Sequence, residues 1–417
     1  MYYAPVVIIG AGQAGLAMSH CLTQRRIEHV VLERGRIAER WRSERWHSLR
    51  LLTPNWMTRL PGWSYDCDDP DGYMTAPEFV RYLADYAGSS GAPIKAETTV
   101  LSVRSTPFGY RVETNWFGWE TRAVVIATGQ CDVPRIPEFA QRLPAWLHQM
   151  TPSEYRNPRQ LPEGGVLVVG ASATGVQLAA EIRQSGRDVV LAAGRHTRLP
   201  RRYRGRDTWW WLERIGVLDE ATDEVSDLQR ARALPSFQLV GGTDGRTIDL
   251  GTLRDAGVRI LGRAVGAEGR ALHLRDDLAE TTGAAQAALE RLLARIDIVA
   301  DASGAPPAAD AMRTLQFGAS PTAFDLGAEG IRTVLWATGY RRDYSWLKVP
   351  VLDVAGEICH DGGIEKSPAS AWSSPRSTAK SVDLPAPFAP TRPAFSPGLS
   401  ANEVASKSGL VPRARLN

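Results

Sequence analysis

The stretch that decides the fold is residues 6–15, VVIIGAGQAG, in which a β-branched run leads into a glycine-rich turn. A helix-favouring stretch with alanine and leucine follows the turn. In such a unit the first glycine permits a tight turn, the second lets the backbone approach a pyrophosphate, and the third allows close packing of helix on strand. The amides at the helix N-terminus then face the phosphates. The candidate cofactor-binding residues of this unit are Gly10, Gly12, Gln13, Ala14 and Gly15.

The same unit occurs a second time in the middle of the chain. Residues 166–175 read VLVVGASATG and lead into another helix-favouring stretch, 176–183. A single glycine turn of this kind is a weak signal, but two copies predict an α/β chain with two Rossmann-like dinucleotide-binding domains. The candidates in the second copy are Gly170, Ser172, Ala173, Thr174 and Gly175.

The residue after the second strand of each unit indicates whether the bound adenosine ribose is free or carries a 2′-phosphate. Glu33 stands there in the first copy, where a carboxylate can accept hydrogen bonds from a free adenosine ribose, as in FAD. Arg195 stands there in the second copy, where it favours the 2′-phosphate of NADPH. The rest of the arginine run 195–206 could add charge, through His196, Arg198, Arg201 and Arg202, or could be a solvated loop or a nucleic-acid patch.

Two later strands close on the same tripeptide. The runs 124–129, VVIATG, and 333–339, TVLWATG, each end in Ala-Thr-Gly, which offers a small, backbone-rich edge for a dinucleotide. Ordinary buried strands with glycine stops are the alternative interpretation. The candidates from this pattern are Ala127, Thr128, Gly129, Thr338 and Gly339.

Composition bounds the remaining possibilities. The formal net charge of +3 over 417 residues argues against a dedicated nucleic-acid binder. The four cysteines lie far apart, with neither a redox pair nor metal-ligand spacing, so we expect no metal. No long apolar run suggests a membrane span, and the N-terminus lacks the basic region of a signal peptide. The expectation is a soluble cytoplasmic protein.

Together these motifs resemble the flavin-containing monooxygenase family, including its bacterial CzcO-like and plant YUCCA-like members, over about residues 4 to 364. The resemblance implies a glutathione-reductase-like plan that binds FAD and NADPH. It also implies that the aromatic segment 39–63 wraps the flavin ring. By position, Trp41 and Arg42 flank the FAD, Leu51, Thr53 and Pro54 line the isoalloxazine, and Asn55 lies near its reacting edge.

The activity that the resemblance implies is monooxygenation of a small organic substrate. NADPH reduces FAD, dioxygen adds at flavin C4a, and the resulting (hydro)peroxide transfers oxygen, with Asn55 donating a hydrogen bond nearby. One alternative is a flavin-dependent NAD(P)H oxidase or reductase without oxygen transfer. Another is a nucleotide-binding remnant without turnover. The central family motif is incomplete, with His148 retained but Arg142 and Pro144 in the preceding positions, which leaves these alternatives open.

The expected domain order is an FAD domain over 1–150, an NADP domain with an insertion over 151–332, and a return to the FAD domain over 333–365. Residues 366–417, rich in proline, serine and alanine, are expected to be a disordered tail and lack the family's flavin-contacting Gly-Asp. Within the insertion, 283–296 is expected to be an amphipathic helix. The run 207–216, DTWWWLERIG, favours a buried helix face over a cover for the active-site mouth.

Overall fold

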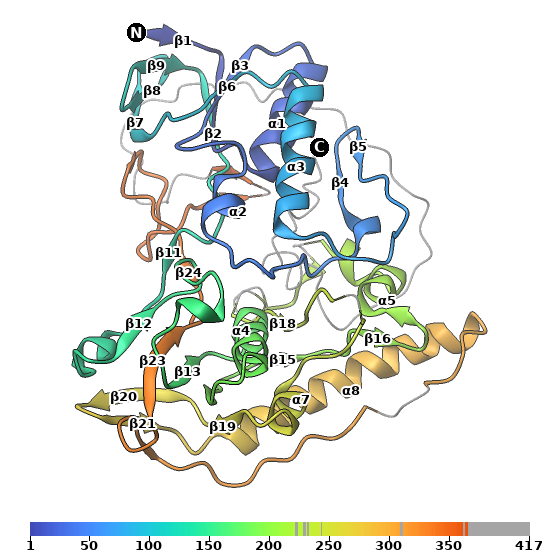
Figure 1. Cartoon of the computed structure of the whole chain (residues 1–417). Helices are drawn as coiled ribbons and strands as arrows, with labels where there is room; N and C mark the ends of the chain where they lie inside the picture. Colours follow the sequence, from blue (N-terminus) through green and yellow to red (C-terminus); the bar gives the residue numbers. More distant parts are fainter. Residues whose placement is uncertain are drawn as a thin grey trace.

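The computed structural model describes residues 1–365 except 222, 223, 228–230, 232, 243, 309–311 and 362. The predicted disordered tail, 366–417, lies outside the described residues. Figure 1 shows two lobes, an upper one built mostly from the first 125 or so residues and a lower one built from the middle of the chain. The two glycine turns lie in different lobes.

The upper lobe is organised around a parallel sheet of four strands in the order β10-β2-β3-β6. Ile8 and Val31 point to a core shared with the flanking helices, whereas Val7 and Val30 join a core on the opposite face. Burial on both faces explains why these strands are runs of β-branched residues. The elements are β2 (Val6–Ile9), β3 (His29–Leu32), β6 (Ile94–Lys95), β10 (Ala123–Ile126), α1 (Gln13–Gln24) and α3 (Ala76–Ser89).

A second sheet covers the far face of this one, in the order β1-β9-β8-β7-β25. Its strands β7 to β9 form an antiparallel meander, and β25 comes from much later in the sequence. Val103 and Val112 pack with Leu347 against the first sheet. The strands are β1 (Tyr2–Tyr3), β7 (Val100–Thr106), β8 (Gly109–Thr114), β9 (Gly118–Thr121) and β25 (Leu347–Lys348).

The lower lobe repeats the parallel arrangement with five strands in the order β12-β23-β13-β14-β19. Its central strands are fully buried between two hydrophobic cores. The elements are β12 (His148–Met150), β13 (Gly165–Val169), β14 (Val189–Ala192), β19 (Arg259–Leu261), β23 (Ile331–Trp336), α4 (Ala173–Gln184) and α7 (Leu250–Asp255). A meander of β20 (Ala264–Glu268), β21 (Ala271–Leu274) and β22 (Ala323–Asp325) lies beside it.

The chain passes between the lobes at a short antiparallel ladder of β11 (Val133–Pro134) and β24 (Tyr340–Arg341). By strand partnership, β12 and β23 belong to the lower sheet, whereas β25 belongs to the upper lobe. The predicted α/β class with two Rossmann-like units is confirmed. The domain boundaries at 150, 332 and 365 stay predictions.

The described residues of the insertion in the lower lobe include the helices α5 (Thr208–Arg214) and α8 (Leu278–Ala302). The helix expected over 283–296 is present and is longer at both ends. Trp209 and Trp211 of α5 are each 1% exposed, which agrees with the favoured reading of this run as a buried helix face. Asp207 caps the helix by accepting a hydrogen bond from the Trp209 amide at 2.8 Å.

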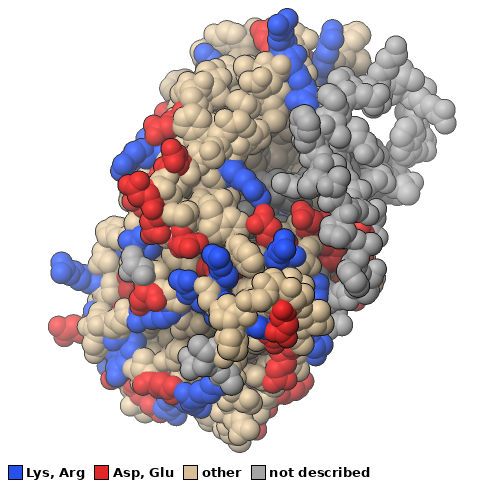
Figure 2. Space-filling view, turned by 90° about the vertical axis from the view of Figure 1, so that its right-hand side faces the viewer, with Lys and Arg blue, Asp and Glu red and all other residues tan. Residues whose placement is uncertain are grey.

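Shorter elements complete the described residues. They are α2 (Glu39–Ser43), η1 (Asn55–Met57), β4 (Arg59–Leu60), β5 (Trp63–Ser64), η2 (Glu138–Arg142), η3 (Pro158–Gln160), β15 (Thr197–Arg198), β16 (Arg202–Tyr203), β17 (Arg206–Asp207), η4 (Val217–Asp219), β18 (Phe237–Gln238), β26 (His360–Asp361) and β27 (Ile364–Glu365). Basic and acidic side chains are interspersed on the face that Figure 2 shows. No helix within the described ranges is both long and apolar enough to cross a membrane.

Candidate functional site

The first glycine turn has the form that a dinucleotide needs. Gly10 has φ +109, and a Cβ added there would lie 2.5 Å from the carbonyl oxygen of Ala127. A Cβ on Gly15 would overlap the carbonyl of Gly10. Gly12, in contrast, has nothing within 4 Å of an added Cβ, and α1 begins after it without a side-chain cap. The open space at uncapped amides fits a pyrophosphate.

Glu33 lies at the end of β3, beside this turn, and is 9% exposed. One carboxylate oxygen accepts a hydrogen bond from the Ala11 amide at 2.7 Å, and the other accepts one from the Gly35 amide at 3.0 Å. Each oxygen keeps a lone pair for another donor. The side chain is therefore held in place by backbone and can still accept from ribose hydroxyls.

The second turn repeats this geometry. Gly170 has φ +108, and a Cβ added there would overlap the carbonyl of Ala337. A Cβ on Gly175 would overlap the carbonyl of Gly170. Helix α4 begins after Ser172, again without a side-chain cap. The two Ala-Thr-Gly segments thus have the same role, because each lies directly against the first glycine of a turn. Thr338 also donates its hydroxyl hydrogen to the carbonyl of Arg135.

Arg195 is exposed at the end of β14, and no carboxylate of the described residues pairs with its guanidinium. A second arginine, Arg263, follows the neighbouring strand β19 and lies against Gly194. A Cβ added to Gly194 would be 3.1 Å from Arg263 Nε. Arg263 pairs with Asp277 at 3.6 Å, so only part of its charge is offset. The carboxyl edge of the lower sheet therefore carries two arginines, of which sequence reasoning found only the first.

Three other residues of the run 195–206, Arg198, Arg201 and His196, are buried and serve packing. Arg198 is buried and pairs with Asp249 at 2.7 Å. Arg201 is 0% exposed and pairs with Asp207 at 2.6 Å. His196 is buried as well, and burial lowers the pKa of its imidazole below the ordinary value, so it is neutral at pH 7. These three residues cannot add free positive charge for a phosphate.

The aromatic segment expected to wrap the flavin borders an open cleft of about 460 Å³. Trp41 and Arg42 line one side of it, and Val80 and Ala84 of α3 line the other. Trp41 also contacts Phe79 edge-on, with 4.8 Å between ring centroids. Arg42 donates to the carbonyl of Ile37 at 2.9 Å.

Leu51, Thr53 and Asn55 lie where the two lobes meet. Leu51 is in the upper core, Thr53 is half-buried, and Asn55 is 8% exposed at the start of η1. The Asn55 amide nitrogen Nδ2 donates to the Asp69 carbonyl at 2.9 Å. Its carbonyl oxygen Oδ1 is buried and has no hydrogen-bond partner among the described residues. One acceptor of Asn55 is therefore buried and unpaired within the described part of the chain.

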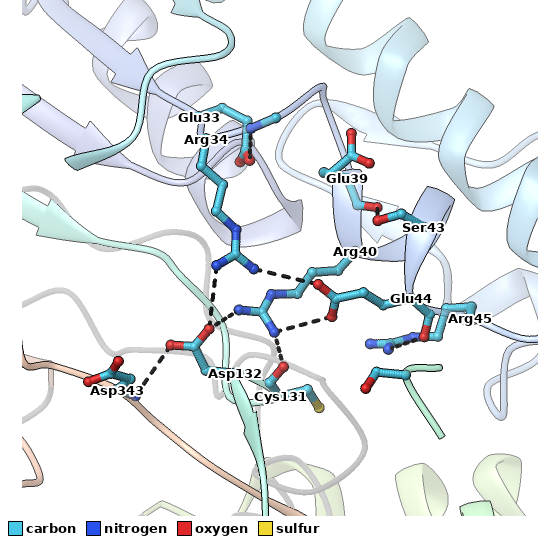
Figure 3. A network of polar contacts seen from close by, with 12 residues as sticks. Glu33, Arg34, Glu39, Arg40, Ser43, Glu44, Arg45, Cys131, Asp132 and Asp343 are labelled. Atoms are coloured by element: carbon cyan, nitrogen blue, oxygen red, sulfur yellow. Dashed lines mark hydrogen bonds and ion pairs between the residues drawn. The ribbon is translucent and has the colours of Figure 1, made fainter. Parts of the chain in front are cut away.

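A network of charged side chains links the segments through which the chain connects the two lobes (Figure 3). Arg34 lies 3.7 Å from Asp132 and 3.6 Å from Glu44. Arg40 of α2 donates to Asp132 and to the preceding carbonyl, and Asp132 accepts from the Asp343 amide at 3.3 Å. The network joins α2 to the segments that follow both Ala-Thr-Gly turns. Sequence reasoning did not find it, because its members are far apart in the chain.

Gln238 is a further residue that the sequence did not single out. It is fully buried on β18 and donates from Nε2 to the carbonyl of Ala171, inside the second glycine turn, at 2.8 Å. In the first turn the backbone amide of Ala38 makes the equivalent bond to Ala11 at 3.1 Å. His148, in the incomplete family motif, is exposed on β12. The described residues contain no cluster of His, Cys, Asp or Glu that could hold a metal.

Comparisons with known proteins agree with this geometry. Residues 7–210 match the family model described as pyridine nucleotide-disulphide oxidoreductase. The chain is 31% identical to an "uncharacterized oxidoreductase CzcO-like" of Geobacillus kaustophilus over 363 residues, which cover 86% of this chain and 87% of that protein. It is 32% identical to the rice indole-3-pyruvate monooxygenase YUCCA1 over 189 residues, 43% of this chain and 45% of that one.

Among solved structures, a flavin-containing monooxygenase from Stenotrophomonas maltophilia is similar with a TM-score of 0.58 and 19% identity, covering 87% of this chain and 86% of that chain. The bacillithiol disulfide reductase of Bacillus cereus has the same fold with a TM-score of 0.52 and 14% identity over 86% of each chain. The four cysteines of this chain are all free. With a CzcO-like oxidoreductase aligned over most of both chains, the protein belongs to the CzcO-like members of the flavin-containing monooxygenase family.

Proposed function

We propose that this chain is a monooxygenase that uses NADPH and dioxygen to place one oxygen atom on a small organic substrate. The balanced reaction consumes NADPH, a proton, dioxygen and the substrate, and yields NADP⁺, water and the oxygenated product. The observation that supports it best is a pair of glycine turns that lead into uncapped helix N-termini and carry opposite charges, with Glu33 beside the first and Arg195 beside the second.

In this proposal the upper lobe holds FAD. The uncapped N-terminus of α1 at Gly12 receives the pyrophosphate, and Glu33 accepts from the adenosine ribose. Ala127, Thr128 and Gly129 would contact the dinucleotide. Trp41 and Arg42 flank it, and Leu51, Thr53 and Pro54 approach the flavin ring. FAD, when bound, supplies the redox chemistry by taking electrons from NADPH and passing them to dioxygen.

In the same proposal the lower lobe holds NADPH, with the second glycine turn and the N-terminus of α4 in the role that the first turn and α1 have for FAD. Ser172 and Thr174, at the N-terminus of α4, would hold the pyrophosphate together with Thr338 and Gly339. Arg195 binds the 2′-phosphate, and Arg263 contributes from the next strand. Guanidinium groups suit this anion because their hydrogen bonds to phosphate are charge-assisted and directional.

Asn55 is the residue for which we propose a role at the reacting edge of the flavin. One Asn55 hydrogen already bonds to the Asp69 carbonyl, so the side-chain plane is fixed. Its second amide hydrogen can then orient substrate or oxygen. The role is one of orientation, and it requires no proton transfer by Asn55 itself.

Labelled dioxygen tests this proposal. The protein is supplied with FAD, NADPH and a panel of amines, sulfides and ketones under ¹⁸O₂, and products are read by mass spectrometry. One ¹⁸O atom per product molecule is the expected result. NADPH oxidation with label only in water or hydrogen peroxide, across the whole panel, would instead indicate an oxidase or reductase. Tight NADPH binding without any flavin retention would indicate a nucleotide-binding protein without turnover.

A further inference from the structure

The carbonyl oxygen of Leu52 accepts two side-chain hydrogen bonds from the opposite lobe. Arg201 Nη1 donates to it at 2.7 Å, and Trp209 Nε1 donates to it at 2.9 Å. Both donors are almost completely buried. Leu52 belongs to the segment expected to line the flavin and stands three residues before Asn55. Two hydrogen bonds to one backbone atom therefore hold residues 51–55, called here the flavin segment, against the lower lobe.

The two donors are themselves held in place. Asp207 Oδ1 accepts from Arg201 at 2.6 Å, and its Oδ2 accepts from the Tyr73 hydroxyl at 2.5 Å. Burial raises the pKa of Tyr73, which keeps this hydroxyl protonated as a donor. The guanidinium carbon of Arg201 lies 4.8 Å from the centre of the Tyr73 ring. A buried charge that is paired and stacked in this way has one orientation, so its direction toward Leu52 is fixed.

The residues that follow the flavin segment also contact the lower lobe. Trp56 and Met57 pack against the hydrophobic cluster that contains Trp209. Arg59 of β4 pairs with Glu213 of α5 at 3.1 Å, and Figure 1 shows β4 and α5 as neighbours. The segment is also bonded to its own lobe, through the Asn55 amide to the Gly72 carbonyl at 2.8 Å and the Trp56 amide to the Pro70 carbonyl at 3.0 Å.

We propose that Arg201 and Trp209 are positioning residues that set the place of Asn55 by holding the Leu52 carbonyl. This inference rests on the proposed role of Asn55 in oxygen transfer. It gives Arg201, which lies in the run 195–206, a role other than phosphate binding. The segment from Arg195 to Arg201 then connects the 2′-phosphate site directly to the flavin segment.

Helix α5 offers a matched pair of variants. Trp209 and Trp211 are equally buried, and each indole donates to one backbone carbonyl. Trp209 donates to Leu52 across the lobes, whereas Trp211 donates to Tyr203 within the lower lobe at 2.7 Å. The changes Trp209→Phe and Trp211→Phe each remove one such bond and keep an aromatic ring. Their general cost to stability is therefore similar, and only Trp209→Phe releases Leu52.

The experiment measures amide hydrogen exchange in full-length protein without cofactors, on peptides that contain Asn55, Trp56 and Met57. We expect exchange there to be about tenfold faster in Trp209→Phe, with no change in Trp211→Phe, at similar losses of melting temperature. The same two proteins, loaded with FAD, are then compared for hydrogen peroxide released per NADPH oxidised. A higher peroxide fraction is expected in Trp209→Phe alone.

Equal exchange of this segment in the two variants would overturn the positioning role, whatever the activity. A peroxide fraction unchanged in Trp209→Phe, despite faster exchange, would overturn its link to Asn55. If the unaltered protein forms no oxygenated product, the proposed function fails. In that case the exchange result still decides whether Arg201 and Trp209 hold the segment.

Discussion

The carboxylate of Glu33 is bonded to the amide of Ala11 at 2.7 Å, which ties the end of β3 to the glycine turn after β2. The turn and the ribose acceptor are thus one rigid unit before any ligand arrives. Such preorganisation lowers the ordering cost of binding. We therefore expect changes at this turn to affect FAD affinity.

Changing Glu33 to Gln should weaken FAD binding by about tenfold or more, because the amide replaces a charged acceptor with a neutral one and turns one acceptor into a donor. Equilibrium dialysis with FAD measures the dissociation constant. Glu28→Gln is the control, since Glu28 is exposed just before the same strand. An equal loss in both variants would contradict the assigned role of Glu33.

The three glycines of the first turn should respond differently to alanine. Gly12→Ala meets no atom within 4 Å, so its melting temperature should stay close to that of the unaltered protein while FAD affinity falls. Gly15→Ala forces a Cβ into the Gly10 carbonyl and should lower the free energy of unfolding by about 1–3 kcal/mol. Thermal melting and flavin retention, measured together, separate the two effects. Full flavin retention by Gly12→Ala would count against pyrophosphate binding at this turn.

Arg195→Gln and Arg263→Gln should each weaken binding of NADPH far more than binding of NADH. Loss of a charge-assisted hydrogen bond costs about 1.5–3 kcal/mol, or roughly 10- to 100-fold in the dissociation constant. The effect should be larger for Arg195, because Asp277 offsets part of the Arg263 charge. Fluorescence titration with both nucleotides gives the ratio. Arg202→Gln, in the same run but exposed and donating to the Gly205 carbonyl, should leave the ratio unchanged.

His196 should make the protein less stable as the pH falls below about 6.5. Burial lowers its pKa in the folded protein, so below the ordinary value of 6.5 the unfolded chain binds a proton that the folded chain does not. Its contribution to stability is therefore complete above pH 6.5 and is lost as the pH falls toward the folded pKa. In His196→Asn the decline between pH 7 and pH 5, measured by urea unfolding, should be shallower. An identical decline would show that other groups cause it.

The local patterns were read correctly from sequence wherever one short segment determines the outcome. The two glycine turns, the acid at Glu33 and the arginine at Arg195 all lie at the ends of strands, as predicted from their spacing. The buried face of α5 also agreed with the hydrophobic pattern. Position after a strand is sufficient here because parallel strands deliver their carboxyl ends to one edge.

What the sequence did not reveal depends on pairs brought together by the fold. Arg263 reaches Gly194 only because β19 pairs with β14. Arg201 resembled a phosphate ligand by its neighbours in sequence, yet its partners, Asp207 and the Leu52 carbonyl, make it a buried contact between lobes. The Asp132 network and Gln238 have no local pattern at all. Such residues are identified by their three-dimensional partners and by burial, neither of which spacing encodes.

The most direct test of the account is the visible absorption spectrum of purified full-length protein incubated with FAD, washed, and then titrated with NADPH without oxygen. We expect a bound-flavin spectrum that bleaches with one equivalent of NADPH, and far less readily with NADH. A protein that stays colourless after incubation with FAD, or a flavin spectrum that NADPH leaves unchanged, would contradict it.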